Sequence, residues 1–329
     1  MSNLNGSKSQ NLTRVLVVIV NYCTPSLTIN CLRSLQGEVQ SFPGIRVAVA
    51  DNDSGDNSVE QIQTAIASEH WEDWADLIPL ERNGGYAFGN NAVIRPALQW
   101  EHPPDYFLLL NPDTVVYPGA IETLVNFMES HREVGLAGSG MVNGLGVFKQ
   151  RSFRFHTILS EFDSGLRLGI VSKLLSNWTM TKPMPDEPAP ADWLPGASLM
   201  VRRQVFESVG LLDEGYFLYY EETDFCLQAK RGGWSCWRVP ESRVMHMAGQ
   251  STGVTTPGSR KRLPQYWFDS RRRYFIKNHG WMYAVVADTV WILGFACWRF
   301  RRIIQQKPDP DPPHFLSDFI RHSAWFNFQ

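Results

Sequence analysis

Four apolar runs recur in the first third of the sequence, and their spacing constrains the fold more than any other feature. They are VLVVIV (15–20), IRVAVADN (45–52), DLIPLE (76–81) and YFLLLN (106–111), about thirty residues apart with helix-like segments between them. This rhythm is typical of βαβ units. Because the runs are apolar throughout rather than alternating, we expect parallel strands that are buried on both faces and flanked by helices.

Polar residues follow each run, at the point where each strand would end. Parallel α/β sheets bind ligands beyond the carboxyl ends of their strands, so these residues predict a binding site at one edge of the sheet. They are Asn21, Tyr22, Asp51, Asn52, Asp53, Glu81, Arg82, Asn83, Asn111 and Asp113. A single carboxylate in such a place more often caps the next helix. The density of polar residues in 51–56 exceeds what capping needs.

Composition excludes several classes of protein. The 329 residues are 43% hydrophobic and 19% charged, enough for one large or two closely packed domains. A formal net charge of −2 disfavours a nucleic-acid-binding protein, which needs a surplus of Lys and Arg. The five cysteines form no C-x-x-C pair, which argues against a zinc ribbon or a disulfide scaffold. Residues 1–13 lack the features of a secretory signal, so we expect a disordered tail and a cytoplasmic protein.

The segment ERNGGYAFGNNAVI (81–94) places two adjacent glycines before a predicted helix. Glycines let the backbone approach a ligand closely, and the start of a helix favours anions. The spacing is not G-x-G-x-x-G, and no glycines follow the first strand. A nicotinamide-binding enzyme is therefore poorly supported.

The second half carries a group of acidic residues and one notable histidine. Glu221, Glu222 and Asp224 lie within four positions at the start of a predicted helix. Acids are common in a first helical turn, but close like charges can raise the pKa of one carboxyl towards that of a useful base. His246 ends a short predicted strand, where a lone histidine is more often structural. Residues 250–265 are polar and rich in turn formers, and we expect a mobile loop over the site.

The order of these motifs resembles an inverting family 2 glycosyltransferase of the GT-A fold, in the bacterial rhamnosyltransferase-like branch. The motifs are VVIVNY, VADNDSGDNS, NGGYAFGNN, LLLNPDTVV, WLPGASLMVRRQVFESVGLLDEGYFLYYEETDFCLQAKRGGW and VMHMAGQST. The resemblance implies a Rossmann-like α/β catalytic domain over 14–255. Its nucleotide-sugar-binding half would be 14–115 and its acceptor-binding half 116–255, with a helical region at 256–329.

The resemblance also implies a nucleotide-diphosphate sugar as donor. Asp51 would contact the base of the nucleotide, and Asp113, at the acidic end of the family's D-x-D motif, would ligate a divalent cation together with His246. Oxygen ligands with one imidazole suit Mn²⁺ or Mg²⁺. The residues assigned to the donor are Asn21, Tyr22, Asp51, Asp53, Asn83, Gly85, Asn111 and Asp113.

Two positions depart from the family's pattern. Asn111 replaces the first acid of D-x-D, which leaves the metal one carboxylate fewer. The catalytic pair, usually Glu-Asp, is here Glu221 and Glu222. Glu222 is the base by alignment, and Glu221 is the fallback assignment. A saccharide or lipid-linked saccharide acceptor would be bordered by Asp192, Trp193 and Gly196.

The apolar segment 281–298 would form a helix of ~27 Å, slightly short of the ~30 Å hydrocarbon core of a bilayer. Asp288 near its middle disfavours a spanning helix. The segment needs cover from the catalytic domain, from a second subunit in a homodimer, or from lipid. Flanking cations such as Arg271 and Arg299 favour peripheral contact with an anionic membrane. The alternative is a packed helix with a solvated basic rim.

The sequence thus predicts a metal-dependent, inverting glycosyltransferase of polysaccharide or glycolipid biosynthesis. The donor would be a dTDP- or UDP-sugar, with dTDP-rhamnose as the leading candidate by resemblance. Two alternatives stay open. A nucleotidyltransferase of sugar phosphates would need a basic glycine-rich signature where this chain has NYCTPS. A catalytically silent nucleotide-binding or membrane-scaffold protein would fit Asn111 and Glu222.

Overall fold

The computed structural model of the chain describes residues 14–143, 151–183, 185–247 and 261–326. The predicted disordered tail, 1–13, and most of the predicted mobile loop lie outside the described residues. The last residues of that loop belong to the described part, and the helix α9 begins at Gln265.

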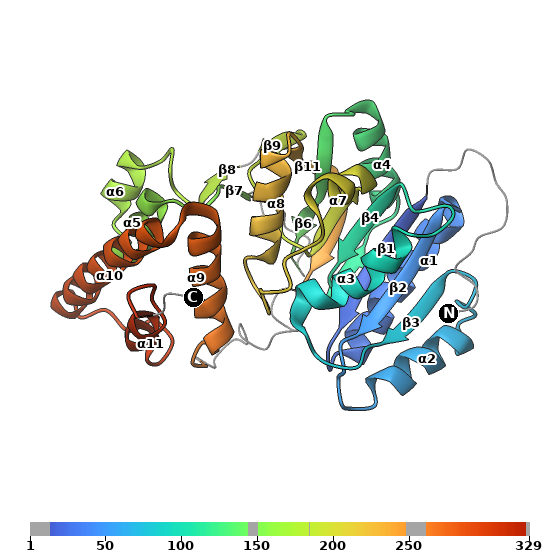
Figure 1. Ribbon diagram of the computed structural model, residues 1–329, viewed down its shortest axis with the longest axis horizontal. Helices are drawn as coiled ribbons and strands as arrows, with labels where there is room; N and C mark the ends of the chain where they lie inside the picture. The colour runs from blue at the N-terminus through green and yellow to red at the C-terminus, as the bar shows by residue number, and fades with distance from the viewer. Residues whose placement is uncertain (1–13, 144–150, 184, 248–260, 327–329) are drawn as a thin grey trace.

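The four predicted strands form one half of the central sheet (Figure 1). They are β1 (Val15–Asn21), β2 (Ile45–Asp51), β3 (Ala75–Pro79) and β4 (Tyr106–Leu110). They pair in parallel in the order β3-β2-β1-β4. The predicted fold class is therefore confirmed.

The other half of the sheet mixes strand directions. β10 (Ser198–Arg202) runs antiparallel between β4 and β6 (Val134–Val142), and β11 (Ser235–His246) runs parallel to β6. β5 (Thr114–Val116) and β9 (Ala189–Ala191) pair with β11, while β7 (Arg151–Phe153) and β8 (Thr181–Pro183) form a separate pair.

Helices cover both faces of the sheet, which explains why the strands are apolar throughout. Val15, Val17 and Ile19 pack on the face covered by α1, α2 and α4, whereas Leu16 and Val18 pack on the face covered by α3, α7 and α8. The helices are α1 (Pro25–Ser41), α2 (Ser58–Ser68), α3 (Gly85–Ala97), α4 (Ala120–Ser130), α7 (Arg203–Val209) and α8 (Glu221–Arg231).

The remaining helices form a second body beside the sheet, which we call the C-terminal lobe: residues 158–178 and 265–326 (Figure 1). It contains α5 (Ile158–Leu166), α6 (Gly169–Leu174), α9 (Gln265–His279), α10 (Trp281–Ile304) and α11 (Phe315–Arg321). α5 and α10 touch closely because both present glycine: a Cβ on Gly165 would lie 2.5 Å from the carbonyl oxygen of Trp291.

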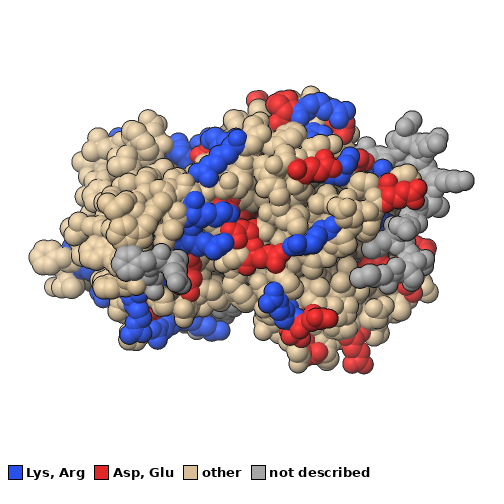
Figure 2. Space-filling view, viewed as in Figure 1, with Lys and Arg blue, Asp and Glu red and all other residues tan. Residues whose placement is uncertain are grey.

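Ion pairs join this lobe to the sheet domain. On α9, Arg273 and Lys277 bind Asp213 at 2.9 and 2.8 Å, and Lys277 also binds Asp224 of α8 at 2.6 Å. Figure 2 shows Lys and Arg side chains meeting Asp and Glu in the seam between the two bodies. The lobe is thus held against the segment that leads into α8.

A buried ionic cluster holds the lobe together internally. Arg271 of α9 pairs with Glu161 of α5 at 2.7 Å and with Asp288 of α10, and all three side chains are buried. Burial alone would raise the pKa of Glu161, but Arg271 and His156 outweigh it and bring that pKa down to about 2. Asp288 also accepts the backbone N–H of Ala324 at 2.7 Å.

The cluster explains the acid in the middle of α10. By length and composition α10 could cross a membrane, and 33% of its most apolar window is buried inside the protein. Asp288 lies on the buried side and is paired with Arg271. Asp288 therefore helps to hold α10 against α5 and α9.

We predict that Asp288→Ala lowers the free energy of unfolding by about 3 kcal/mol, because it leaves the buried Arg271 guanidinium with one carboxylate fewer. The matched control is Asp309→Ala, which removes the partly exposed pairs with Arg299 and Arg302 and should cost at most about 1 kcal/mol. Denaturant unfolding measures both. Equal losses in the two variants would contradict the structural role of the cluster.

Candidate functional site

The carboxyl ends of β1 and β2 meet in a hydrogen-bonded group of buried polar side chains. Register pairs Asn21 with Asp51, and Asn21 Nδ2 donates to Asp51 Oδ2 at 2.6 Å. Ser54 donates to the same carboxylate, from its hydroxyl at 2.7 Å and from its backbone N–H at 3.1 Å. Thr28 in turn donates to Asn21 Oδ1 at 2.8 Å. The Asp51 carboxylate is therefore held in one orientation.

A second group forms around the start of α3. Asn52 Nδ2 donates to Asn83 Oδ1 at 2.9 Å and to the carbonyl oxygen of Gly85 at 3.1 Å. Gly85 has a φ of +88°, and a Cβ there would lie 2.0 Å from the backbone oxygen of Phe217. The backbone N–H of Tyr86 donates to that same oxygen at 2.9 Å. Glycine is thus required for this loop to reach the segment before α8.

Asp113 and His246 lie together although 133 positions separate them. Pairing of β5 with β11 sets Thr114 opposite His246, and His246 Nε2 lies 3.2 Å from Asp113 Oδ1. The two atoms are not aligned as a hydrogen bond, and neither oxygen of the buried Asp113 carboxylate accepts one from any described residue. Leaving a buried carboxylate without donors is costly, so this pair fits a cation.

The described part of the chain holds no group of three or more His, Cys, Asp or Glu side chains placed to bind a metal ion. A cation at Asp113 and His246 would therefore need further ligands besides these two side chains. Phosphate oxygens or water would meet that need.

Glu221 and Glu222 begin α8, against the loop after β9. Glu222 Oε1 accepts the backbone N–H of Gly196 at 3.0 Å, and the Tyr86 hydroxyl donates to the Gly196 carbonyl at 3.0 Å. Burial raises the pKa of Glu222, and burial together with the charge of Glu222 raises that of Glu221 well above its usual range. One carboxyl of such a pair keeps its proton to a higher pH than an ordinary glutamic acid does.

The backbone just before α8 is strained, and residues of other elements hold it in place. Tyr219 and Tyr220 both have a φ of +70°, in the left-handed region that ordinary residues rarely adopt. Ser270 of α9 donates to the carbonyl oxygen of Leu218 at 3.0 Å, and the ring of Tyr220 lies 5.5 Å from that of Tyr274 of α9. The C-terminal lobe therefore fixes the backbone from which Glu221 and Glu222 project.

The other predicted site residues lie less centrally. Tyr22 and Asp53 are exposed, and Asn111 is half-buried beside the β4 end. Asp192 pairs with Lys230 at 2.9 Å, and the Trp193 ring stacks on Phe153. The contacts of Asp192 and Trp193 thus run towards β7 and the end of α8, whereas Gly196 contacts Glu222 at the start of α8.

Sequence reasoning missed three contributors. Tyr86 bridges the glycine loop and the Glu222 loop, Phe217 receives the tight approach of Gly85, and Thr28 orients Asn21. Tyr86 stands inside the glycine segment quoted above, but nothing in the sequence indicates that its hydroxyl reaches residue 196.

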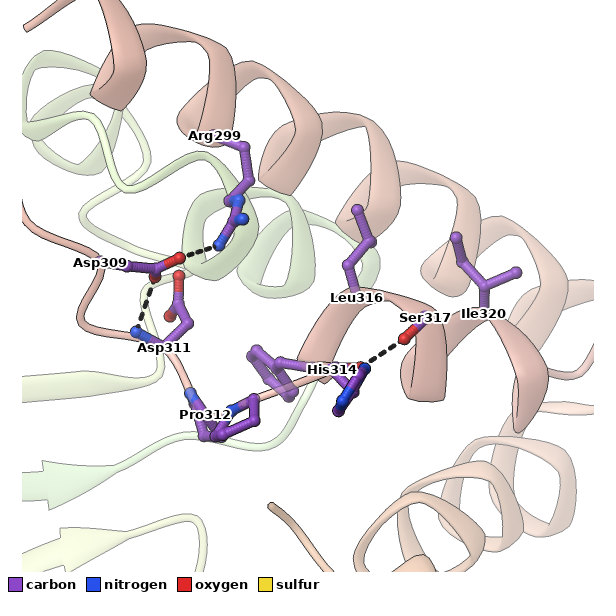
Figure 3. A pocket seen from close by; sticks show the side chains of 10 residues that line it. Arg299, Asp309, Asp311, Pro312, His314, Leu316, Ser317 and Ile320 are labelled. Atoms are coloured by element: carbon purple, nitrogen blue, oxygen red, sulfur yellow. Dashed lines mark hydrogen bonds and ion pairs between the residues drawn. The ribbon is translucent and has the colours of Figure 1, made fainter. Parts of the chain in front are cut away.

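A cavity of about 560 Å³ lies elsewhere, between the end of α10 and α11 (Figure 3). Apolar residues of 312–320 and the Arg299–Asp309 ion pair line it. None of the predicted site residues borders it, so we do not assign the chemistry to it.

The fold has solved counterparts among glycosyltransferases. The structure of GalNAc-T7 with UDP, GalNAc and Mn²⁺ aligns with a TM-score of 0.56 at 13% identity, over 95% of this chain and 55% of that one. Staphylococcus aureus TarS 1–349 with UDP-GlcNAc aligns with a TM-score of 0.54 at 12% identity, over 94% and 79%. The chain thus spans about half the length of the GalNAc-T7 chain. These matches establish the GT-A class of glycosyltransferase fold.

Residues 16–208 match the model of the glycosyl transferase family 2, and the chain belongs to this family. Its relatives include the N-acetylglucosaminyl-diphospho-decaprenol L-rhamnosyltransferase of Mycobacterium tuberculosis, 26% identical over 64% of this chain and 68% of that protein. The rhamnosyltransferase WbbL of Escherichia coli K12 is 29% identical over 50% and 62%. The predicted family and its rhamnosyltransferase-like character are confirmed, and glycosyl transfer is the activity that follows.

We predict that Gly85→Ala lowers the free energy of unfolding by about 3 kcal/mol or more, because its Cβ would overlap the Phe217 carbonyl. Gly233→Ala is the control: it shares the φ of +88° but has no atom within 4 Å, and it should cost about 1–2 kcal/mol from strain alone. Denaturant unfolding compares the two. Similar losses would mean that the Gly85–Phe217 approach relaxes freely.

Proposed function

We propose that the chain transfers a sugar, with inversion, from a nucleotide-diphosphate donor to a saccharide or a lipid-linked saccharide. The observation that carries the proposal is the buried Asp113 carboxylate, which lacks hydrogen-bond donors among the described residues and lies 3.2 Å from His246 Nε2. The similarity to rhamnosyltransferases, among them the dTDP-rhamnosyl transferase RfbF of Shigella flexneri, supports dTDP-rhamnose as the donor. The diphospho-decaprenol in the name of the M. tuberculosis relative supports a lipid-linked acceptor.

The donor nucleotide would lie along the carboxyl ends of β1, β2 and β4. The oriented Asp51 carboxylate would accept from an N–H of the base, beside Asn21. The backbone around Asn83 and Gly85 would approach the nucleotide, and the exposed Tyr22 and Asp53 would close the outer side.

Asp113 and His246 would bind the diphosphate end through Mn²⁺ or Mg²⁺. A bound cation would neutralise the negative charge that develops on the departing nucleoside diphosphate. Asn111 would support the donor without adding a charge.

Glu222 would act as the general base. Its Oε1 is held by the Gly196 N–H, so Oε2 would take the proton from the acceptor hydroxyl. The acceptor oxygen would form a bond to the anomeric carbon as the bond from that carbon to the phosphate oxygen breaks. Asp192, Trp193 and Gly196 would border the acceptor. The reaction would take place in the cytoplasm, at the inner face of the membrane when the acceptor is lipid-linked.

We predict that Asp113→Asn weakens Mn²⁺-dependent binding of dTDP or UDP at least about tenfold, because the cation loses its carboxylate ligand. His246→Ala should have a smaller effect in the same direction. Asp56→Asn, at an exposed carboxylate near Asp51, is the control and should leave binding unchanged. Titration calorimetry with and without Mn²⁺ measures this. Metal-independent binding that is equal in all variants would count against the metal site.

We predict that Glu222→Gln lowers sugar transfer about 100-fold or more while nucleotide binding stays intact, because the base is lost. Glu221→Gln should lower it less, and the reverse ranking would assign the base to Glu221. Since the pKa values of both carboxyls are raised, the wild-type rate should fall on acidification with a midpoint above 4.5, the ordinary value for Glu. A midpoint at or below 4.5 would contradict a buried base.

A further inference from the structure

Exposed hydrophobic side chains are concentrated in the C-terminal lobe. Among the described residues, 13 of the 16 exposed large hydrophobic side chains belong to it, and so does every one that is more than half exposed. Scattered single exposures are normal on a soluble protein, but concentration on one lobe is not. The exposed hydrophobic surface of the lobe is therefore a candidate binding surface for a partner.

The surface follows one side of α10. Ala284, Ala287, Trp291 and Phe295 face the interior, with Asp288 among them. The exposed residues recur on the opposite side at spacings of three, four and seven, which places them in one stripe. They are Met282, Val286, Leu293, Cys297, Phe300 and Ile304. The stripe is ~33 Å long at ~1.5 Å per residue.

The stripe ends in a cluster that we call the distal tip: Ile170 and Leu174 of α6 with Phe300, Ile303 and Ile304 of α10. These side chains are 65 to 75% exposed. α10 is fixed there to the end of α5, two residues before α6 begins, because the Arg301 guanidinium donates to the carbonyl oxygens of residues 166 and 167 at 2.9 and 2.8 Å. The tip lies at the end of the molecule farthest from the sheet (Figure 1).

The C-terminal segment 256–329 has a formal charge opposite in sign to that of the rest of the chain. Residues 256–329 hold 12 Lys and Arg against 5 Asp and Glu, a formal charge of +7, while residues 1–255 hold 19 against 28, a charge of −9. Exposed Lys173 stands between Ile170 and Leu174, and exposed Lys307 follows Ile304. Figure 2 shows the outer part of the lobe as mainly uncharged, with Lys and Arg gathered along its lower edge.

We propose that the α10 stripe and the distal tip dock the protein on an anionic lipid bilayer, with α10 lying in the plane of the interface. Exposed apolar side chains would enter the boundary between headgroups and acyl chains, while the surrounding cations attract anionic lipid. A second copy of the chain is a poorer occupant, since it would bring together two C-terminal segments, 256–329, each with a formal charge of +7. α10 does not span the bilayer, because its other side is bound to α5 and α9 through Asp288 and Arg271.

Vesicle flotation tests the proposal with the full chain, using phosphatidylcholine vesicles with and without phosphatidylglycerol. We expect wild type to float with the anionic vesicles, less so at high salt. Phe300→Gln combined with Ile303→Gln should reduce the bound fraction at least about tenfold, and Lys173→Glu combined with Lys307→Glu should reduce it about tenfold on anionic vesicles only. Tyr117→Gln and Arg132→Glu, exposed on the sheet domain, are the matched controls and should not change it.

Circular dichroism and denaturant unfolding establish that each variant is folded, and neither depends on vesicles or on a nucleotide. Absence of wild-type flotation with anionic vesicles would overturn the proposal, and so would equal losses in the tip and control variants. A stable dimer in sedimentation velocity that dissociates on Phe300→Gln with Ile303→Gln would assign the surface to a second copy and also overturn it. Because flotation requires neither donor nor turnover, its result is independent of the proposed transferase activity.

Discussion

The site depends on the burial of polar side chains at the ends of strands that are otherwise apolar. Two buried carboxylates at this edge of the sheet differ in the hydrogen-bond donors around them. Asp51 is surrounded by donors from Asn21 and Ser54, so its charge is compensated within the protein. Asp113 is equally buried, but its carboxylate oxygens accept no hydrogen bond from any described residue, and His246 Nε2 lies 3.2 Å from Oδ1. The first arrangement suits recognition of a neutral base, and the second suits a cation with its phosphates.

The C-terminal lobe is part of the site although it supplies none of its proposed reacting groups. Two consecutive tyrosines with positive φ precede Glu221, a conformation that persists only where the surroundings enforce it. Ser270 and Lys277 of α9 bind on either side of this turn, at Leu218 and Asp224. The same lobe presents the exposed stripe. A contact made by the lobe with lipid would therefore be transmitted to α8, which begins at Glu221, through the single helix α9.

Local sequence patterns predicted the strands well and the long-range pairs poorly. The buried runs ended within about two residues of the observed strands, because burial on both faces leaves a continuous apolar signature. The partners of Asp288 could not be predicted, since Arg271 and Ala324 lie 17 and 36 positions away on other elements. Likewise, the meeting of Asp113 and His246 was available only through resemblance to a family. The hydrogen bond of the Tyr86 hydroxyl could not be predicted, because a single side-chain contact produces no periodic pattern in the sequence.

The cluster around Arg271 also bears on how the chain is made. Glu161 leaves the ribosome 110 residues before Arg271, so its carboxylate has no guanidinium partner for roughly 5–20 s at ~5–20 residues per second. During that interval β1, β2, β3 and β4 can already pair, whereas α5 lacks α10, which packs against it. The nascent protein thus passes through a stage in which the sheet can be complete while the C-terminal lobe is not. At that stage the apolar side chains of α5 are uncovered and open to chaperone binding.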